Sequence, residues 1–221
     1  MRCALSLLVL ACVQAPAASL EPGGTGTVVF SSDRTGVHQL YLLEVASGGP
    51  RRLVETGREE RHPRWSPDGK RIAYESLGAG TRDLFVVGID GGRPRRVTEG
   101  ASAASPDWSP DGERLVFVSH REGQAALWTI RVDGEDARRL SPPGARDRWP
   151  DWSPDGTRIA FSSIVDGDEE IFVMNADGSE RRRLTTRAGV DARPRWSPDG
   201  RELVYAEASP RTGGADRLMR I

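Results

Sequence analysis

Short apolar runs separated by polar turns recur along the chain, and their spacing predicts strands throughout. Residues 158–161 alternate polar and apolar side chains, so that Ile159 and Phe161 share one face, as in a half-buried strand. Residues 171–174 are continuously apolar, as a fully buried strand would be. An Ala-Asp-Gly-Ser turn and a basic strand at 182–185 complete a unit of four strands, the first being the segment that precedes residue 158.

The same order of strands recurs in five registers. The second strand of the unit recurs at 28–30, 72–74, 115–117 and 203–205, the third at 40–42, 84–86, 127–129 and 218–220, and the fourth at 51–53, 95–97 and 138–140. A period of about 44 residues with four short strands is typical of a β-propeller blade. We therefore predict an all-β propeller of about five four-stranded blades.

The two end units are incomplete. The first lacks its inner strand, and the last stops before its outer strand. A ring normally closes by building one blade from both chain ends, which removes exposed sheet edges. Because these two units lack different strands, we expect a ring with two thin blades, an open arc that seeks a partner, or the remnant of a longer propeller.

The pentapeptide Trp-Ser-Pro-Asp-Gly occurs four times, at 65–69, 108–112, 152–156 and 196–200. Its last four residues have the order of a type I turn. A large flat side chain beside an inner strand suits the wedge between two blades, although a platform for a sugar or cofactor is the alternative. These structural positions are Trp65, Asp68, Gly69, Trp108, Asp111, Gly112, Trp152, Asp155, Gly156, Trp196, Asp199 and Gly200.

The N-terminus predicts export. A basic residue followed by an apolar run reads as a signal peptide at 1–17, cleaved after Ala17. Lipoprotein processing is the alternative, which would remove 1–11 and leave Cys12 acylated and the protein anchored to a membrane. We expect a flexible linker at 18–26 and a β-propeller domain at 27–221, in the periplasm or secreted. That domain has no cysteine and therefore no disulfide.

Charge and composition exclude several functions. The chain has 221 residues, enough for one domain, with 31 basic and 32 acidic residues. No net field would therefore attract nucleic acid or an anionic membrane. Paired arginines fall on the predicted outermost strands, where charge discourages the addition of another strand. These arginines are at 51–52, 95–96, 138–139 and 181–183.

The search for catalytic chemistry is largely negative. No G-x-S-x-G motif is present, so a serine peptidase is not supported. Only three histidines occur, of which His38 and His120 fall at predicted loops or strand starts and are expected to be solvated. His62 precedes a proline at an inner strand, but its counterparts in other units are not metal ligands. We therefore predict no enzyme activity, no metal and no cofactor.

The segments that enter the inner strands differ between units, while the pentapeptides stay uniform. Repetition brings these segments to one end of the ring, around the mouth of the central channel. Variable side chains on a uniform frame suit a recognition surface, although unselected loop variation would look the same. The candidate partner-binding residues are Glu60, Arg61, His62, Ser105, Arg148, Trp149, Asp191 and Arg193.

The string P-x-WSPDG-x-x-I-A-F at 150–161, followed by IFV and RRLT, resembles the WD40-like (PD40) repeats of the TolB family. The resemblance covers residues 27–221 and implies a periplasmic, non-catalytic propeller that binds proteins, such as a peptidoglycan-associated lipoprotein. TolB itself has an α/β domain ahead of its propeller, and this sequence shows no counterpart. Similar repeats occur in prolyl oligopeptidase-type peptidases and in lyases of uronate sugars. A carbohydrate-binding or uronate-lyase-like propeller is therefore the alternative function.

Overall fold

A computed structural model describes residues 26–45, 48–78, 80–186, 189–208 and 217–221. These residues form strands, turns and loops, and none of them lies in a helix, so no membrane-spanning helix is found in them. The predicted signal peptide, the lipidation candidate Cys12 and the linker up to residue 25 lie outside the described residues.

In the part of the chain that the structure describes, five antiparallel units follow one another, and we call them blades 1 to 5. Blade 1 consists of β1 (Thr27–Ser32), β2 (Gln39–Glu44) and β3 (Pro50–Arg52). Blade 2 consists of β4 (Glu59–Trp65), β5 (Arg71–Gly78), β6 (Thr81–Gly88) and β7 (Gly91–Arg96). Blade 3 consists of β8 (Ala103–Trp108), β9 (Arg114–Ser119), β10 (Ala126–Arg131) and β11 (Arg138–Arg139).

Blade 4 consists of β12 (Asp147–Trp152), β13 (Arg158–Val165), β14 (Asp168–Asn175) and β15 (Arg182–Arg183). Blade 5 consists of β16 (Val190–Trp196), β17 (Leu203–Ala208) and β18 (Arg217–Arg220). One parallel bridge, between Glu169 and Val190, joins blades 4 and 5 into a continuous sheet. Three complete blades thus lie between two three-stranded ones, as the sequence predicts.

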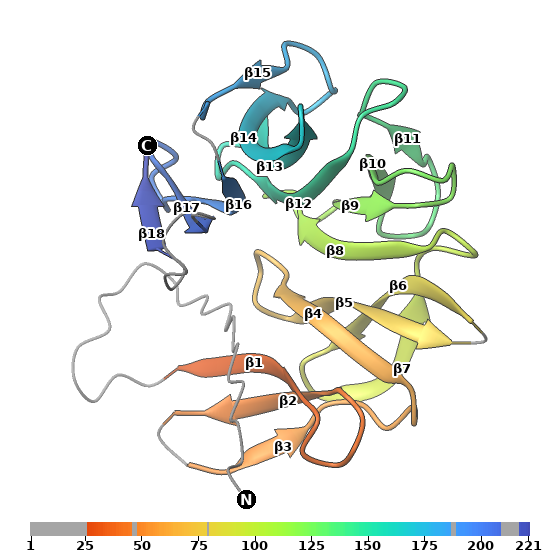
Figure 1. Ribbon diagram of the computed structural model, residues 1–221. Helices are drawn as coiled ribbons and strands as arrows, with labels where there is room; N and C mark the ends of the chain where they lie inside the picture. Colours follow the sequence, from red (N-terminus) through yellow and green to blue (C-terminus); the bar gives the residue numbers. More distant parts are fainter. Residues whose placement is uncertain (1–25, 46–47, 79, 187–188, 209–216) are drawn as a thin grey trace, which may run out of the picture.

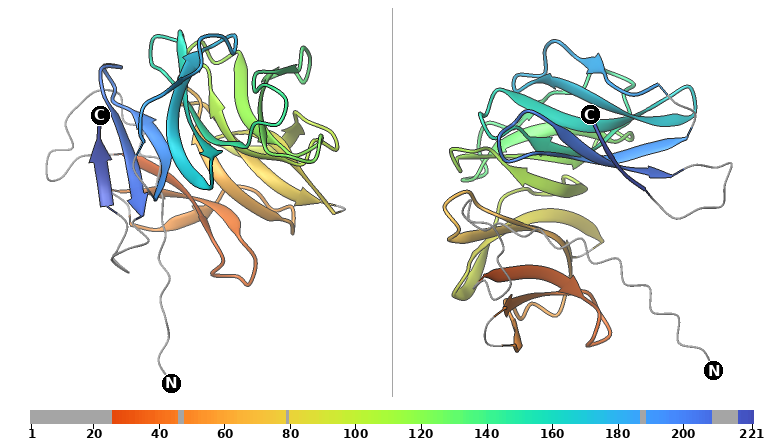
Figure 2. Two further views of the ribbon diagram at one scale, coloured as in Figure 1. Left: turned by 45° about the horizontal axis from the view of Figure 1, so that its top comes forward. Right: turned by 90° about the vertical axis from the view of Figure 1, so that its left-hand side faces the viewer.

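The blades are arranged around a common axis. Figure 1 shows β4, β8, β12 and β16 nearest the centre, and Figure 2 shows the blades from the side, fanned about that centre. Each blade packs on the next one, and no comparable packing joins β16–β18 to β1–β3 among the described residues. The predicted propeller is therefore confirmed, and its ring is open between blades 5 and 1.

Each pentapeptide Trp packs in the apolar cluster between its own blade and the preceding one. Trp65 packs with Val29 and Leu40 of blade 1, and Trp108 packs with Leu84 of blade 2. The other two tryptophans lie in the same way against the clusters between blades 3 and 4 and between blades 4 and 5. Large aromatic side chains thus fill the wedges that no single blade could bury alone.

The Ser-Pro-Asp-Gly segments form the predicted turns. In the third copy the Gly156 N–H donates to the Ser153 carbonyl at 2.9 Å, and Gly156 has a φ of 75°, which glycine adopts without strain. Asp155 accepts hydrogen bonds from Ser153 Oγ at 2.6 Å and from the Thr157 N–H at 3.0 Å. These hydrogen bonds lower the pKa of Asp155 to about 2. The other three turns repeat this arrangement.

The arginines of the outermost strands also tie the blades together. Arg51 of β3 donates from Nη2 to the carbonyl of Ile89 in blade 2, at 2.6 Å. Within blade 2, Arg96 of β7 pairs with the buried Asp83 at 2.7 Å. These strands therefore combine a charged edge with specific hydrogen bonds.

Candidate functional site

A β-bulge interrupts each of the four inner strands at the same repeat position. The residue at the bulge precedes a proline and has a positive φ, with values of 49° for His62, 51° for Ser105, 53° for Trp149 and 57° for Arg193. Proline cannot donate a ladder hydrogen bond, so the register slips there. Left-handed backbone is uncommon for residues other than glycine, which makes its recurrence at four equivalent positions a feature of the repeat.

Three of these four bulge residues meet at the axis. The rings of His62 in blade 2 and Trp149 in blade 4 lie edge to face, with centroids 5.4 Å apart. The guanidinium of Arg193 in blade 5 stacks over the Trp149 ring at 4.7 Å. Blade 3 separates blades 2 and 4 along the chain, so a contact between their side chains requires that both reach toward the axis. We call His62, Ser105, Trp149 and Arg193 the axis cluster.

A buried carboxylate in blade 2 supports this cluster. Glu75 of β5 lies with Oε1 3.1 Å from His62 Nδ1, and its Oε2 accepts the Ser105 N–H at 3.0 Å. Burial alone would raise the pKa of Glu75, but His62, the Ser105 amide and Arg82 together lower it. Glu75 therefore satisfies a backbone donor that the bulge of blade 3 leaves outside the ladder.

Sequence reasoning missed Glu75, although a signal existed. In the strands equivalent to β5, its position is occupied by Val118 in blade 3, Ser162 in blade 4 and Ala206 in blade 5. A lone acidic residue in an otherwise apolar buried strand needs a partner, because an unpaired buried charge is costly. That mismatch between copies of the repeat was the available clue.

The rim around the axis cluster carries positive charge. Arg148 is exposed, and neither Arg148 nor Arg193 has an ion pair with any residue that the structure describes. Arg61 and Arg82 both lie beside Glu59. The pKa of His120, in the loop after β9, is lowered by burial and then by the charges of Arg148 and Arg82.

Two of the predicted partner-binding side chains lie inside the protein instead. Glu60 is fully buried and accepts hydrogen bonds from Thr56 and from the Leu40 N–H, and burial raises its pKa. Asp191 is 3% exposed. The expectation that these carboxylates face the channel mouth is therefore corrected. Along β4, Glu60 alternates with the partly exposed Glu59 and Arg61, because a strand presents successive side chains to opposite faces.

A ring of charged residues lies two positions after the bulge residues along the inner strands. It consists of the residue before each Trp, namely Arg64, Asp107, Asp151 and Arg195. Arg195 donates to Asp151 at 2.8 Å, and Arg64 lies 3.7 Å from Asp107. We call these four residues the charge ring. Sequence reasoning did not single them out.

The carboxylates of the charge ring also hold neighbouring blades in register. Asp107 accepts the backbone N–H of Trp152 at 2.8 Å, and Asp151 accepts that of Trp196 at 2.7 Å. Burial raises the pKa of Asp107 to about 6, and burial together with the charge of Asp107 raises the pKa of Asp151. Because amides and arginines occupy these carboxylates, the ring is suited to joining blades.

The described residues contain no group of three His, Cys, Asp or Glu side chains that could hold a metal ion. The axis cluster instead offers an aromatic face, a stacked guanidinium, an imidazole and, at its rim, the exposed Arg148. Such groups recognise a ligand by stacking, hydrogen bonding and ion pairing. The arrangement is thus chemically suited to noncovalent recognition.

Comparison with known proteins agrees with this architecture. The family model of the TolB beta propeller domain (PD40) matches residues 60–148 and 145–217. A putative TolB from Agrobacterium tumefaciens is 30% identical with a TM-score of 0.69, over 79% of this chain and 67% of that one. TolB from Acinetobacter baumannii is 22% identical with a TM-score of 0.76, over 88% of this chain. This chain spans only 48% of the Acinetobacter protein.

Enzymes share the fold at lower identity. A puromycin hydrolase is 19% identical with a TM-score of 0.69, over 95% of this chain and 35% of that one. Oligogalacturonate lyases also have similar propellers. No protein with a curated description matches the chain. Since the family model covers most of the sequence, this chain belongs to the TolB beta propeller domain family.

Proposed function

We propose that this protein is an exported, non-catalytic propeller that binds a protein or peptide of the cell envelope at the channel mouth. The observation that carries the proposal is the convergence of equivalent bulge residues from different blades on one axis. His62, Trp149 and Arg193 come from blades 2, 4 and 5 and touch one another. Membership of the TolB family supports the same function.

The composition of the mouth suits a protein partner. Trp and Arg are enriched among the residues that dominate binding energy in protein interfaces. Trp149 and Arg193 are both partly exposed, and Arg148 beside them is exposed. Ser105 is 9% exposed and contributes mainly through its backbone. The surface offered to a partner is therefore Arg61, His62, Arg148, Trp149 and Arg193.

A non-catalytic role is supported by the chemistry of the described residues. They contain no cluster of metal ligands, and the sequence has no nucleophile elbow. The carboxylates of Asp107 and Asp151 accept hydrogen bonds from backbone amides. Each also faces an arginine, with Arg195 at 2.8 Å from Asp151 and Arg64 at 3.7 Å from Asp107. General acid–base catalysis needs a group that reaches a substrate proton, and these carboxylates are already engaged.

Binding can be tested by recovery of partners from an envelope extract by the purified protein. We expect the triple substitution Arg148→Ala, Trp149→Ala and Arg193→Ala to abolish the recovery of a specific partner. The matched control is Arg93→Ala with Arg138→Ala and Arg182→Ala, which removes three exposed arginines from the outer strands. Recovery that the first variant leaves unchanged, or the absence of any specific partner, would contradict the proposal.

Export needs its own test, because the segment concerned lies outside the described residues. Mass spectrometry of the protein from its native envelope would identify the mature N-terminus. Residue 18 at the N-terminus corresponds to cleavage after Ala17, and an acylated Cys12 corresponds to a lipoprotein. An intact N-terminus and recovery from the cytoplasm would contradict export.

A carbohydrate-binding or uronate-lyase-like function remains the alternative prediction. It would use the same mouth and would require a bound metal ion or a sugar polymer there. Metal analysis of the purified protein and a glycan-binding screen separate the two functions. Specific binding of a uronate polymer that is lost in the triple variant would favour this alternative over a protein partner.

A further inference from the structure

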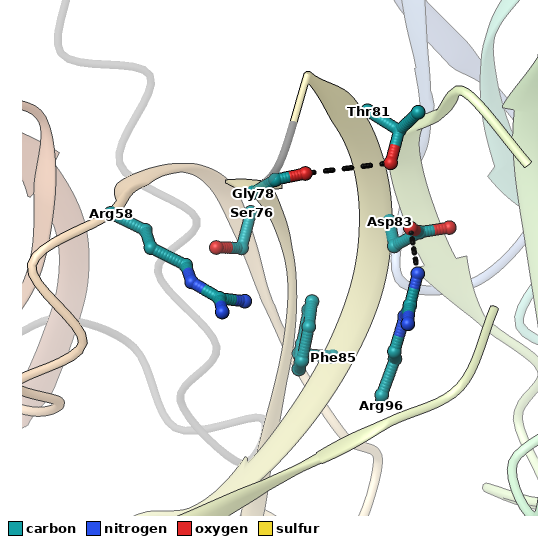
Figure 3. A pocket seen from close by; sticks show the side chains of 7 residues that line it. All are labelled: Arg58, Ser76, Gly78, Thr81, Asp83, Phe85 and Arg96. Atoms are coloured by element: carbon teal, nitrogen blue, oxygen red, sulfur yellow. Dashed lines mark hydrogen bonds and ion pairs between the residues drawn. The ribbon is translucent and has the colours of Figure 1, made fainter. Parts of the chain in front are cut away.

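A pocket of about 110 Å³ lies in blade 2, and none of its lining residues belongs to the axis cluster. Residues of β5, β6 and β7 form it together with Arg58, which directly precedes β4, as Figure 3 shows. A water molecule occupies roughly 30 Å³ in the liquid, so the pocket has room for a ligand of a few heavy atoms. Its lining residues are Arg58, Ser76, Gly78, Thr81, Asp83, Phe85 and Arg96.

Two polar groups at this pocket have no partner among the described residues. Ser76 is 3% exposed, and its hydroxyl makes no hydrogen bond there. The guanidinium of Arg58, at the rim, forms no ion pair with those residues, and Figure 3 shows Arg58 on the same side of the pocket as Ser76, opposite Asp83 and Arg96. A buried hydroxyl without a partner is unfavourable, so a ligand that accepts its hydrogen bond would be stabilised.

The one carboxylate of the pocket is already neutralised. Asp83 pairs with Arg96 at 2.7 Å and accepts hydrogen bonds from Thr98 Oγ1 at 2.9 Å and from the Ala101 N–H at 3.1 Å. These bonds to Arg96, Ala101 and Thr98 outweigh burial and lower the pKa of Asp83. The charge of Arg58 therefore makes the pocket positive overall.

Comparison of the blades explains why there is space at this position. In blades 1, 3 and 4 an arginine of the same blade covers the aromatic side chains of the two middle strands. Arg34 stacks over Tyr41 at 4.5 Å, and Arg121 stacks over Trp128 at 4.4 Å. Arg181 stacks over the Phe161 and Phe172 rings of blade 4.

Each of these arginines also bonds to the serine that is equivalent to Ser76. The donor–acceptor distances are 3.2 Å from Arg34 to Ser32, 3.1 Å from Arg121 to Ser119 and 2.7 Å from Arg181 to Ser163. An arginine seat thus exists in three blades, made of a serine hydroxyl and an aromatic face.

In blade 2 this seat has no such arginine. Tyr74 and Phe85 form the equivalent aromatic pair, with ring centroids 5.9 Å apart, and no cation stacks over it among the described residues. Gly78 occupies the position, two residues after the serine, at which blades 1 and 3 have Arg34 and Arg121. The loss of that side chain leaves Ser76 without its partner and creates the pocket.

We propose that the blade 2 pocket binds a carboxylate group, with Arg58 as its ion-pair partner and the Ser76 hydroxyl as a second donor. A guanidinium presents paired N–H donors that match the two oxygens of a carboxylate. A cationic ligand is disfavoured because Arg58 and Arg96 both line the space. This site shares no residue with the axis cluster and goes beyond the proposed function.

A carboxylate could come from a small free acid or from an Asp or Glu side chain of a partner, and a titration can separate these sources. The full chain, with its arginine side chains labelled for NMR, is titrated with sodium acetate and with sodium chloride at equal ionic strength. We expect saturable shifts of the Arg58 Nε–H signal with acetate only. A blocked Gly-Glu-Gly tripeptide and its Gly-Gln-Gly counterpart form the second arm.

The two arms give distinct results. Tighter binding of the Glu tripeptide than of acetate identifies a partner's side chain as the ligand, while binding of acetate alone identifies a small acid. Arg58→Gln should weaken binding at least tenfold, and Ser76→Ala should weaken it several-fold. Equal shifts with chloride and acetate, or binding that Arg58→Gln leaves unchanged, would overturn the proposal.

Gly78→Arg is the sharpest control, because it rebuilds the arginine seat of blades 1 and 3. Gly78 has no positive φ, and the atoms nearest to an added Cβ are the guanidinium of Arg58, at 2.8 Å, which a flexible side chain can withdraw. We expect this variant to fold with an unchanged or higher melting temperature and to lose the carboxylate site. Retained acetate binding in a folded Gly78→Arg protein would overturn the proposal.

Discussion

The two ends of each inner strand follow different rules. At the turn end, Ser-Pro-Asp-Gly bonds within itself, as when Asp155 accepts from Ser153 and from Thr157. At the bulge end, side chains bond between blades, as when Glu75 accepts the Ser105 N–H and His62 meets Trp149. Local bonds can be copied from repeat to repeat. A side chain that bonds to another blade need not be the same in every copy of the repeat. Recognition of a partner needs such differences between copies.

The largest expected effect on stability comes from replacing a Trp packed between blades, and it should exceed the effect of replacing the Trp of the axis cluster. Trp108 is 5% exposed in the wedge between blades 2 and 3, and its Nε1 donates to the Arg64 carbonyl at 3.1 Å. Trp108→Ala should lower the free energy of unfolding by about 3–5 kcal/mol. Trp149→Ala should lower it by about 1 kcal/mol, because Trp149 is partly exposed. Urea unfolding measures both free energies, and equal losses would show that the axis cluster stabilises the fold as much as the packing between blades does.

The charge ring predicts a pH dependence of stability. The pKa of Asp107 is raised to about 6 in the folded chain, so the folded state binds more protons than the unfolded state between about pH 4 and pH 6. Stability from this group therefore falls as pH rises through that window. Asp107→Asn keeps an acceptor for the Trp152 N–H and does not titrate. We expect it to reduce the fall, on the order of 1–2 kcal/mol, between pH 4 and pH 7.

The measurement is the free energy of unfolding of both proteins across that pH range. A fall of the same size in the wild type and in Asp107→Asn would contradict the raised pKa. Asp111→Asn is a suitable control. The pKa of Asp111 is lowered by its Ser109 hydrogen bond, so this substitution should not reduce the fall of stability with rising pH.

A substitution in the Ser-Pro-Asp-Gly turn should have a smaller and strictly local effect on stability. Asp155→Ala removes three hydrogen bonds from one turn and should lower the free energy of unfolding by about 1 kcal/mol at pH 7. Because the folded pKa of Asp155 is lowered to about 2, its contribution is present above about pH 4 and is lost as pH falls toward 2. Thermal melting at pH 7 and near pH 2 checks both statements. A loss of stability that persists at pH 2 would contradict this account.

The smallest effect on stability comes from the rim. Arg148→Ala should change the free energy of unfolding by less than about 0.5 kcal/mol, because Arg148 is exposed. It should nevertheless raise the pKa of His120, since the charge of Arg148 helps to lower that pKa. NMR titration of His120 measures the shift, with Arg182→Ala in β15 as a control that leaves it unchanged. An unaltered His120 would show that Arg148 does not act across the blades.

Much of the fold was predictable because its signals are local. The order Ser-Pro-Asp-Gly specifies a turn within five residues, and the apolar runs on either side specify strands. The tryptophans and the incomplete end blades followed from aligning the copies. That alignment also identified His62, Ser105, Trp149 and Arg193 as equivalent positions, which the bulges of the structure share.

Other features could not be predicted, because they depend on which side chains face each other. Alternation along β4 buries Glu60, and Asp191 of β16 is buried as well, although both lie beside mouth residues in the sequence. Glu75 was inconspicuous until the bulge of blade 3 supplied an amide for it. The pocket at Ser76 became visible only when the arginines of the other blades were seen to occupy its equivalents.

The sequence by itself determined the period, the strand order, the turns and which positions of the repeat lie at the same distance from the propeller axis. The tertiary structure alone decided that the ring is open, that His62 touches Trp149 across the axis, and that blade 2 lacks the arginine of its neighbours. The physical reason is the range of the forces involved. A turn is specified by adjacent residues, whereas contacts between blades depend on chain segments that only the finished arrangement brings together.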